Sequence, residues 1–318
     1  MSQISRFLTV VCSVVALAAC NSSQSPTYTP PNSGPRFYVT QSGIFVLGFN
    51  TTANGNATPP LQITGSGTQL ATATGIVRDS TGKIYVANTG QNQLLVFPPN
   101  VGGNVSPVYQ VSGSSTQLSA PFGLAITSQG YLLVANQTSN AVTEYLLPAN
   151  GNIAPSVTIA GANTTFNAPE GVAVDATGNI YVASFSGNSI AVFPATASGN
   201  VAPLRTISGA ATGLNGPIGL AFDSSGNLYV SNDLGNSITV YSPGANSNAP
   251  PTRTISGNLT NLVAPEFIAV DSNNRLYVSN FGTPGFPSYD LVFSSGANGN
   301  ATPAQVVGPL SQSVGMSL

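Results

Sequence analysis

A pattern that returns every 48 residues constrains the fold of this chain more than any other feature of its sequence. Its clearest copy covers residues 168–183 and reads APEGVAVDATGNIYVA. The copies share one central position, which is occupied in turn by Tyr38, Tyr85, Leu133, Tyr181, Tyr229 and Tyr277, with a step of 47 only between the first two. A unit of this length cannot bury its own apolar faces, so the six consecutive units are expected to stack on one another.

Each unit contains four short apolar runs separated by turn residues. In the unit that begins at Glu170 these runs, named A to D, cover residues 171–174, 180–183, 189–193 and 204–208. None is long enough for a helix, and β-branched and aromatic residues dominate runs B and C, which favours strands. Run B is apolar at consecutive positions, so we expect its sheet to be covered on both faces. Run A alternates small and large residues, which is typical of a crowded strand near a central axis.

These features predict an all-β fold for residues 36–318, namely a six-bladed β-propeller of four-stranded antiparallel blades. The folded part of the chain starts in a B run at Phe37 and ends at residues 314–318, which are a candidate A run. We therefore expect the C-terminal strand to complete the first blade, which closes the ring and leaves no open sheet edge. A monomer is expected.

The repeated units resemble NHL repeats. The resemblance is carried by three kinds of position: the Pro-x-Gly starts at Pro121, Pro169 and Pro217, the Asp-x-x-Gly turns at Asp79, Asp175 and Asp223, and the Tyr-Val pairs that follow them. It covers residues 36–318 and implies a propeller fold, in a family that includes scaffolds, binding modules and some enzymes. The long C-to-D connection, such as residues 197–203, departs from the family pattern.

The first 35 residues are predicted to export and anchor the chain. Residues 1–19 have the form of a signal peptide, because Arg6 is followed by thirteen mostly apolar residues, too few to span a membrane. The tetrapeptide Leu17-Ala18-Ala19-Cys20 resembles the lipobox of bacterial lipoproteins, which implies cleavage before Cys20 and lipidation of its thiol. An ordinary signal peptide with an incidental cysteine is the alternative.

The position after the cysteine and the segment that follows it refine this prediction. Asn21 in place of Asp implies sorting to the outer membrane, if the organism has two membranes. Residues 20–35 then read as a flexible Pro- and Ser-rich linker that holds the propeller off the membrane. We therefore expect an exported protein that is lipid-anchored in the bacterial cell envelope.

The composition excludes several classes of function. Only 5% of the 318 residues are charged, with 7 basic and 9 acidic residues and no histidine. A basic footprint for nucleic acid is absent from this sequence. Without histidine there is no Ser-His or Cys-His couple and no imidazole zinc site. Propeller lyases that open streptogramin rings rely on histidine, as the family resemblance implies, so this chain departs from them. Only a hydrolase that uses carboxylates and a metal remains chemically possible.

Candidate ligand contacts lie where the D-to-A and B-to-C connections meet the central channel. Just before the strand A glycine, successive units place Thr74, Phe122, Glu170, Ile218, Glu266 and Val314. Just after strand B, they place Gln41, Asn88, Asn136, Ser184, Asn232 and Asn280. We expect Phe122, Asn88 and Asn136 to contact a ligand at this face. Turn capping is the alternative for the asparagines.

Three acids on one half of this face suggest a calcium site, because Ca²⁺ takes hard oxygen ligands from carboxylates and amides. The candidate ligands are Glu170, Asp233, Glu266, Asn232 and Asn280. Pro169-Glu170-Gly171 also resembles the Pro-acid-Gly motif that supplies a metal ligand in six-bladed gluconolactonase-type hydrolases. The alternative for the acids is a set of solvated charges at the rim. By contrast, the acids of the A-to-B turns, such as Asp175, are expected to cap their own turns.

The sixth unit carries four extra residues within 281–290. Phe281, Phe286 and Tyr289 in this insertion are candidate contacts for a sugar, a peptide or a partner surface, or else they fold back on their own blade. Three functions therefore remain open. The first is a non-enzymatic, membrane-anchored module that binds protein or glycan through this face. The second is a Ca²⁺-dependent lactonase-like hydrolase, and the third is a passive envelope component.

Overall fold

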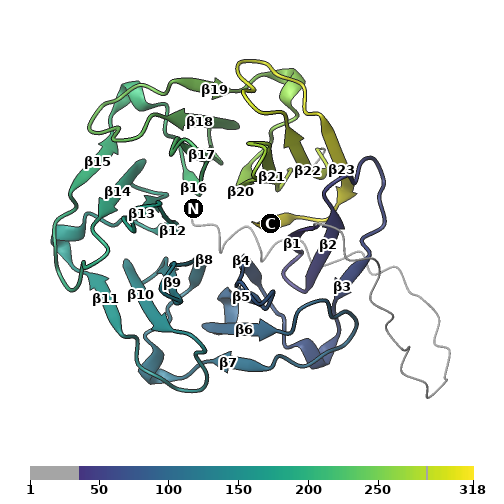
Figure 1. The fold of residues 1–318 in the computed structure, drawn as a ribbon, viewed down its shortest axis with the longest axis vertical. Helices are drawn as coiled ribbons and strands as arrows, with labels where there is room; N and C mark the ends of the chain where they lie inside the picture. The colour runs from purple at the N-terminus through teal and green to yellow at the C-terminus, as the bar shows by residue number, and fades with distance from the viewer. Residues whose placement is uncertain (1–35, 284–285) are drawn as a thin grey trace.

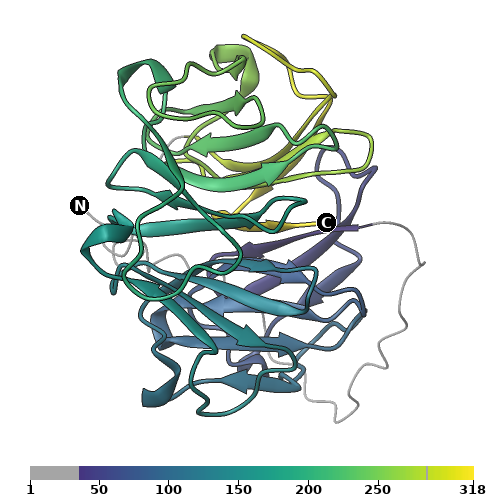
Figure 2. The ribbon, with the colours of Figure 1, turned by 60° about the vertical axis from the view of Figure 1, so that its left-hand side comes forward.

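The computed structural model describes residues 36–283 and 286–318. Within these ranges the chain forms six four-stranded antiparallel sheets, which stand around a central axis as the blades of a propeller (Figure 1). The sheets twist and face one another across their broad sides (Figure 2). The predicted all-β, six-bladed architecture is confirmed. No helix in the described ranges is both long and apolar enough to cross a membrane.

The blades are numbered one to six in chain order, beginning with the first repeat. Blade one consists, from the axis outward, of β24, β1, β2 and β3, and every later blade takes four strands in chain order. The strands of the first three blades are β24 (Ser313–Ser317), β1 (Arg36–Gln41), β2 (Phe45–Asn50), β3 (Leu61–Ile63), β4 (Ala73–Arg78), β5 (Ile84–Asn88), β6 (Gln93–Phe97), β7 (Tyr109–Val111), β8 (Pro121–Ile126), β9 (Tyr131–Asn136), β10 (Ala141–Leu146) and β11 (Val157–Ala160).

The second half of the ring repeats this order. Its strands are β12 (Pro169–Val174), β13 (Ile180–Ser184), β14 (Ser189–Phe193), β15 (Arg205–Ser208), β16 (Pro217–Phe222), β17 (Leu228–Asn232), β18 (Ser237–Tyr241), β19 (Arg253–Ile255), β20 (Pro265–Val270), β21 (Leu276–Asn280), β22 (Ser288–Phe293) and β23 (Gln305–Leu310). Short 3₁₀ turns stand between the strands at η1 (Ser66–Thr68), η2 (Thr89–Gln91), η3 (Ser114–Thr116), η4 (Ala162–Thr164), η5 (Ala210–Thr212) and η6 (Asn258–Thr260).

The ring is closed at the axis as the sequence predicts. Strand β24 pairs antiparallel with β1, with Val39 opposite Met316, so the C-terminus supplies the innermost strand of blade one. Residues from blades one and six, among them Phe37, Tyr277 and Val314, share one buried apolar cluster. The two ends of the folded chain therefore lie in one sheet, and neither leaves an exposed inner edge.

A second closure runs around the outside of the propeller. The long C-to-D connection of each blade reaches back and forms a parallel bridge with the outer strand of the preceding blade. In one example Gly199 bridges Ile159, while the Asn200 side-chain oxygen accepts a hydrogen bond of 2.8 Å from the Asn163 backbone N–H in η4. The bridge between Gly55 and Val307 joins blade one to blade six. The connections that depart from the NHL pattern therefore form a belt that ties each blade to its neighbour.

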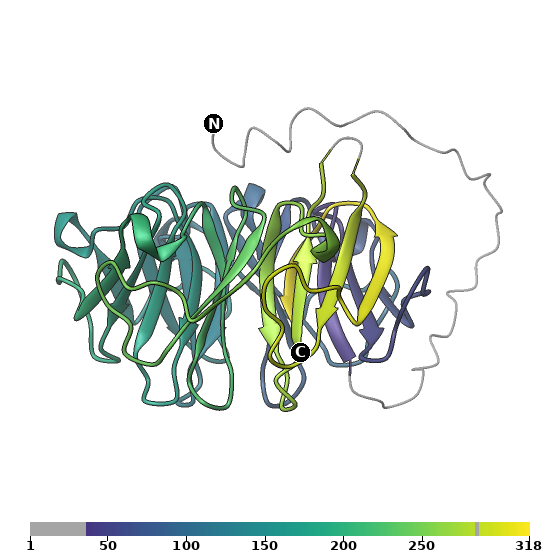
Figure 3. The same ribbon diagram turned by 90° about the horizontal axis from the view of Figure 1, so that it is seen from above.

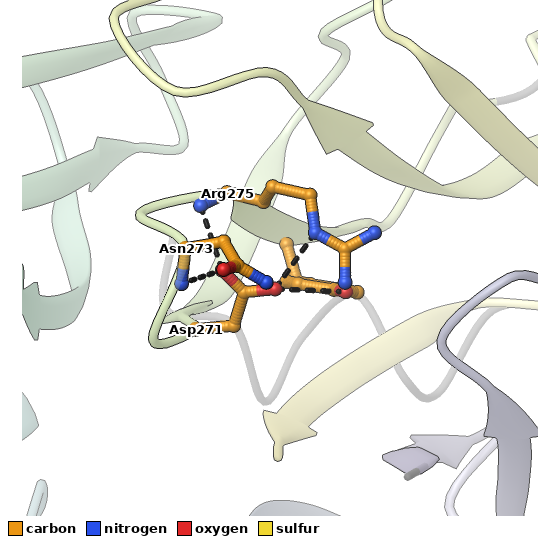
Figure 4. Close-up of polar contacts among 4 residues, drawn as sticks. Asp271, Asn273 and Arg275 are labelled. Atoms are coloured by element: carbon orange, nitrogen blue, oxygen red, sulfur yellow. Dashed lines mark hydrogen bonds and ion pairs between the residues drawn. The ribbon is translucent and has the colours of Figure 1, made fainter. Parts of the chain in front are cut away.

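The Asp-containing turns between strands A and B lie at one end of the propeller, which we name the lower face. Figure 4 shows one of them, where Asp271 Oδ1 accepts the backbone N–H groups of Asn273 (2.9 Å) and Arg275 (2.8 Å). Asp271 Oδ2 also accepts Arg275 Nε at 2.7 Å. Burial raises the pKa of Asp271, but the hydrogen bonds from Arg275 outweigh it and hold the pKa below its usual value. The predicted turn-capping role of these acids is confirmed.

Candidate functional site

The opposite end, which we name the upper face, carries the D-to-A and B-to-C connections. At this end two aromatic rings lie across the axis of the propeller. Phe122 on β8 and Phe267 on β20 come from blades three and six, which stand on opposite sides of the ring (Figure 1). Their rings stack with centroids 5.7 Å apart, and Phe122 is 2% exposed. The aromatic pair therefore fills the axis at the level of the candidate ligand ring.

Phe267 occupies a position that the other five repeats give to glycine. A Cβ atom added to the equivalent glycine would lie between 1.8 and 2.6 Å from a backbone carbonyl oxygen of the next blade, which is too close for any side chain. These glycines are Gly75, Gly123, Gly171, Gly219 and Gly315. The predicted crowding of the A strands is therefore confirmed, and only blade six places a large side chain at this point. Phe267 is not among the contacts predicted from the sequence, although its departure from the glycine pattern is visible in the repeat.

The three candidate acids are buried. Each lies in a pair made by the residue after strand B of one blade and a residue at the start of strand A in the next blade. Glu170 on β12 is 0% exposed, and its Oε1 atom accepts a hydrogen bond of 2.5 Å from Gln137 Nε2, which follows strand β9. Asp233 and Glu266 lie two repeats beyond Gln137 and Glu170 and occupy the same places in blades five and six. Both are exposed by 2% or less. The three acids are therefore interior groups at the mouth of the channel.

The repeated asparagines after strand B direct their side chains into the neighbouring connections. Asn232 Oδ1 accepts the Asn215 N–H at 3.1 Å, and Asn280 Oδ1 accepts the Val263 N–H at 2.7 Å. Asn88 and Asn136 accept backbone N–H groups in the same way, from Ala71 at 2.9 Å and Ser119 at 3.0 Å. All four side chains are buried. This geometry supports the turn-capping interpretation, since these amide oxygens already bind the backbone of their own blade.

The structure shows which of the predicted calcium ligands lie close together and which are already hydrogen-bonded elsewhere. Among the residues that the structure describes, no three acidic or cysteine side chains come close enough together to hold a metal ion. The amide oxygens that were to complete the site are engaged with backbone N–H groups. What the structure brings together is the contact between Gln137 and Glu170, with Asp233 and Glu266 at the equivalent positions two repeats later.

The insertion of blade six forms the second candidate region. In the side view of Figure 3 the yellow-green residues that flank positions 284 and 285, between β21 and β22, rise above the connections of the other blades. The insertion is tied to the connection between η6 and β20, because Phe281 N donates to Ala264 O and Gly282 N donates to Val263 O, both at 3.0 Å. Thr283 and Phe286 exchange two backbone hydrogen bonds of 3.0 and 2.8 Å. Phe286 is 62% exposed on this anchored loop.

A groove of about 670 Å³ separates this insertion from blade five. We name it the blade-five/six groove. Phe286 and Tyr289 line one side, and the other side comes from η6, the residues after it and the B-to-C turn of blade five. Those residues include Asn236, Asn258, Asn261 and Leu262. Two of the three aromatic residues predicted from the insertion therefore meet at one concave surface, whereas Phe281 is partly buried against the cluster around Phe37 and Phe267.

Charged side chains are distributed unevenly between the two faces. The described basic residues all lie on lower-face turns or at the lower ends of strands: Arg36, Arg78, Lys83, Arg205, Arg253 and Arg275. The described acids near the upper face are Glu170, Asp233, Glu266 and Asp290, and each is exposed by 2% or less. The described part of the upper face therefore presents a polar surface without exposed charge. Cys20, the predicted lipid anchor, lies outside the described residues.

Comparison with known proteins places the fold but not the activity. No protein-family model and no curated protein match the chain. A solved protein of unknown function from Bacteroides caccae is similar in structure, with a TM-score of 0.65 and 12% identity over 90% of this chain and 98% of that one. A chain of a nidogen/laminin complex has a TM-score of 0.60 and 14% identity, with 89% and 97% covered. Virginiamycin B lyase from Staphylococcus aureus has a TM-score of 0.53 and 14% identity, with 83% and 79% covered. These similarities show the propeller fold alone.

Proposed function

We propose that this chain is a non-enzymatic binding module that is exported, lipid-anchored through Cys20, and exposed at the bacterial cell envelope. Its partner, a protein or a glycan, binds at the upper face. The observation that carries the proposal is the blade-five/six groove, where the exposed Phe286 stands on an anchored loop beside a concave surface. Exposed aromatic residues on a rigid scaffold are typical of recognition surfaces.

The packing of side chains at the axis of the propeller favours a binding function over a catalytic one. The Phe122–Phe267 pair fills the axis of the propeller, and the candidate acids are buried, each exposed by 2% or less. A histidine-to-alanine variant of virginiamycin B lyase from Staphylococcus aureus is catalytically inactive. This chain has no histidine. The streptogramin-lyase chemistry of that similar structure is therefore not proposed for it.

The resemblance to NHL repeats agrees with this proposal, since the family includes binding modules and scaffolds. The predicted linker of residues 20–35 would hold the propeller away from the bilayer. A single lipidated cysteine with several acyl chains would then provide a stable anchor, because each buried methylene contributes about 0.8 kcal/mol.

Two measurements on the full chain test the proposal. The first compares the membrane fraction of cells that produce the wild-type chain or Cys20→Ser, and we expect the substitution to release the protein from the membrane. The second uses the purified wild-type chain to capture proteins and glycans from the cell surface, with Phe286→Ala as the variant. Leu204→Ala is the matched control, since Leu204 is 60% exposed and lies outside the groove. Capture that is equal for all three chains would contradict a binding role for the groove.

A further inference from the structure

We propose that the blade-five/six groove binds a neutral oligosaccharide. This inference rests on the proposed function, because it names the class of ligand that the same surface would take. Three features of the groove carry it: the absence of charge, the combination of aromatic rings with amides, and the fixed position of its walls.

The first feature is the electrostatic character of the groove. None of the described residues that line it is charged, and the described acids elsewhere at the upper face are exposed by 2% or less. An acidic or basic partner would lose its hydration on binding and would find no opposite charge in return. The groove therefore favours a ligand that is polar but uncharged, and it disfavours sulfated or uronic-acid polymers, charged peptides and anionic lipid headgroups.

The second feature is the chemistry of the lining. Phe286 and Tyr289 supply aromatic rings, whose electron-rich faces attract the weakly positive C–H bonds of a sugar ring. Asn236, Asn258 and Asn261 stand opposite them with exposed side chains. A side-chain amide both donates and accepts hydrogen bonds, as does a sugar hydroxyl, so amides match a polyhydroxylated ligand in either role. A cavity of about 670 Å³ lies within the usual size range for small-ligand pockets.

The third feature is that the walls of the groove are held in place before any ligand arrives. On the blade-five side, Asn236 Oδ1 accepts the Ala264 N–H at 2.8 Å, which fixes the B-to-C turn against the start of the next blade. Asn261 lies at the end of η6, where its backbone oxygen accepts Asn280 Nδ2 at 3.0 Å. On the other side, the insertion is bonded to residues 263 and 264, in the connection that leads from η6 into β20. Fixed walls lower the ordering cost of binding a small polar ligand.

A peptide is the main competing occupant, and the structure favours it less. Peptides commonly bind by adding a strand to an exposed sheet edge. In blade five and blade six the outer strands already carry parallel bridges from a neighbouring connection, between Ile255 and Gly299 and between Gly55 and Val307. The belt thus occupies the edges that a peptide would use beside the groove.

The experiment measures binding of the full chain to an array of neutral, acidic and sulfated oligosaccharides and of uncharged peptides, followed by titration of the best binder. We expect a neutral oligosaccharide to bind, with an affinity that changes little between about 0.05 and 0.5 M NaCl, since salt screens only charged contacts. Phe286→Ala and Asn258→Ala should each weaken binding at least ~10-fold, whereas Leu204→Ala should not. Equal melting temperatures for the variants would show that folding is retained.

The outcomes separate this inference from the proposed function. If an uncharged peptide or a charged glycan binds and Phe286→Ala abolishes its binding, the neutral-saccharide assignment is overturned while the binding role of the groove stands. If a neutral oligosaccharide binds equally well to Phe286→Ala and Asn258→Ala, the groove is not its site, and the inference fails. If nothing on the array binds and the capture of surface components also fails, both proposals are wrong.

Discussion

The rings of Phe122 and Phe267 meet across the axis of the propeller, with 5.7 Å between their centroids and 25° between their planes. They come from opposite blades, so neither blade could form this contact without the complete ring. Both belong to the apolar cluster that also contains the ends of the folded chain. The aromatic pair therefore couples the packing of the axis to the closure of the ring.

Truncating this pair should destabilise the whole domain. We expect Phe122→Ala to lower the free energy of unfolding by about 3 to 5 kcal/mol, because it leaves a cavity that the stiff inner strands cannot fill. The double variant with Phe267→Ala should cost less than the sum of the single changes, since each removes the same ring contact. Urea titration of the four chains measures this coupling. Strictly additive losses would show that the two rings are energetically independent.

A methyl group on the glycine of an inner strand should also destabilise the domain. In Gly171→Ala the new Cβ atom would lie 1.8 Å from the Ile218 carbonyl oxygen, so two blades would have to move apart. We expect a loss of at least ~2 kcal/mol in the free energy of unfolding. Gly187→Ala is the control, because its nearest contact is the side chain of Ser184 at 3.1 Å. A Gly171→Ala variant as stable as this control would contradict the close packing at the axis.

The two closures of the ring should contribute unequally to stability. Removing residues 314–318 deletes most of strand β24 and opens an inner sheet edge, so we expect a large fall in melting temperature with a loss of cooperativity. Asn54→Ala removes only the 2.9 Å hydrogen bond from the Val306 N–H in the exposed belt. Its cost should be about 1 kcal/mol or less. Calorimetry compares the two, and a truncated chain that melts like the wild type would refute closure by β24.

Asp290 should make the stability of the domain decrease as the pH rises. It replaces an aliphatic residue of strand C, is fully buried on β22, and accepts a 2.6 Å hydrogen bond from Ser313 Oγ on β24. Burial raises its pKa from 3.8 to about 7, and the Ser313 bond offsets this only in part. The folded chain thus keeps a proton that the unfolded chain releases near pH 3.8. This stabilising contribution is complete below that pH and is lost as the pH rises through about 7.

The test is urea unfolding of the wild-type chain and Asp290→Asn between about pH 5 and pH 8, where the surface acids are ionised in both states. The wild type should lose stability across this range, whereas the asparagine variant should change much less and be the more stable chain at the upper end. Asp175→Asn is a suitable control, since burial and the hydrogen bonds from Thr177 and Asn179 together leave the pKa of Asp175 below its usual value. Parallel pH profiles of stability for the wild type and Asp290→Asn would disprove the raised pKa of Asp290 in the folded chain.

Calcium should not stabilise the domain if the upper face is a binding surface without a metal. The side-chain oxygens of Asn232 and Asn280 already accept backbone N–H groups, so we expect melting temperatures in Ca²⁺ and in chelator to agree. An ion at ~100 times its dissociation constant would add about 2.7 kcal/mol. A shift of that size that disappears in Glu170→Gln and Glu266→Gln would instead establish a metal site. The lactonase-like alternative would then become the stronger proposal.

Much of the architecture could be read from the repeat. The spacing of Tyr181 and its equivalents predicts the number of blades, and the start at Phe37 and the end near Val314 predict how the ring closes. The capping of turns by aspartate could also be predicted, because an Asp such as Asp271 accepts hydrogen bonds from backbone N–H groups only a few residues away. These features depend on residues that are close in the chain or related by a fixed period.

The candidate site was harder to predict. Phe122 was expected to face a ligand, and its burial depends on Phe267, which lies across the axis from another blade. The sequence did not indicate a partner for Asp290, which is Ser313 on the closing strand. The sequence placed Phe286 and Tyr289 in one loop, but the opposite wall with Asn258 and Asn261 comes from the preceding blade.

The sequence by itself therefore determined the fold class, the blade count and the polar, charge-poor character of the surface, since these follow from periodicity and composition. Only the tertiary structure decided that Phe122 and Phe267 fill the axis, that the long connections form an outer belt, and that a groove opens beside the insertion. The physical reason is that a propeller buries its residues between blades. Which side chain meets which then depends on the radius and closure of the whole ring, and no single repeat encodes either quantity.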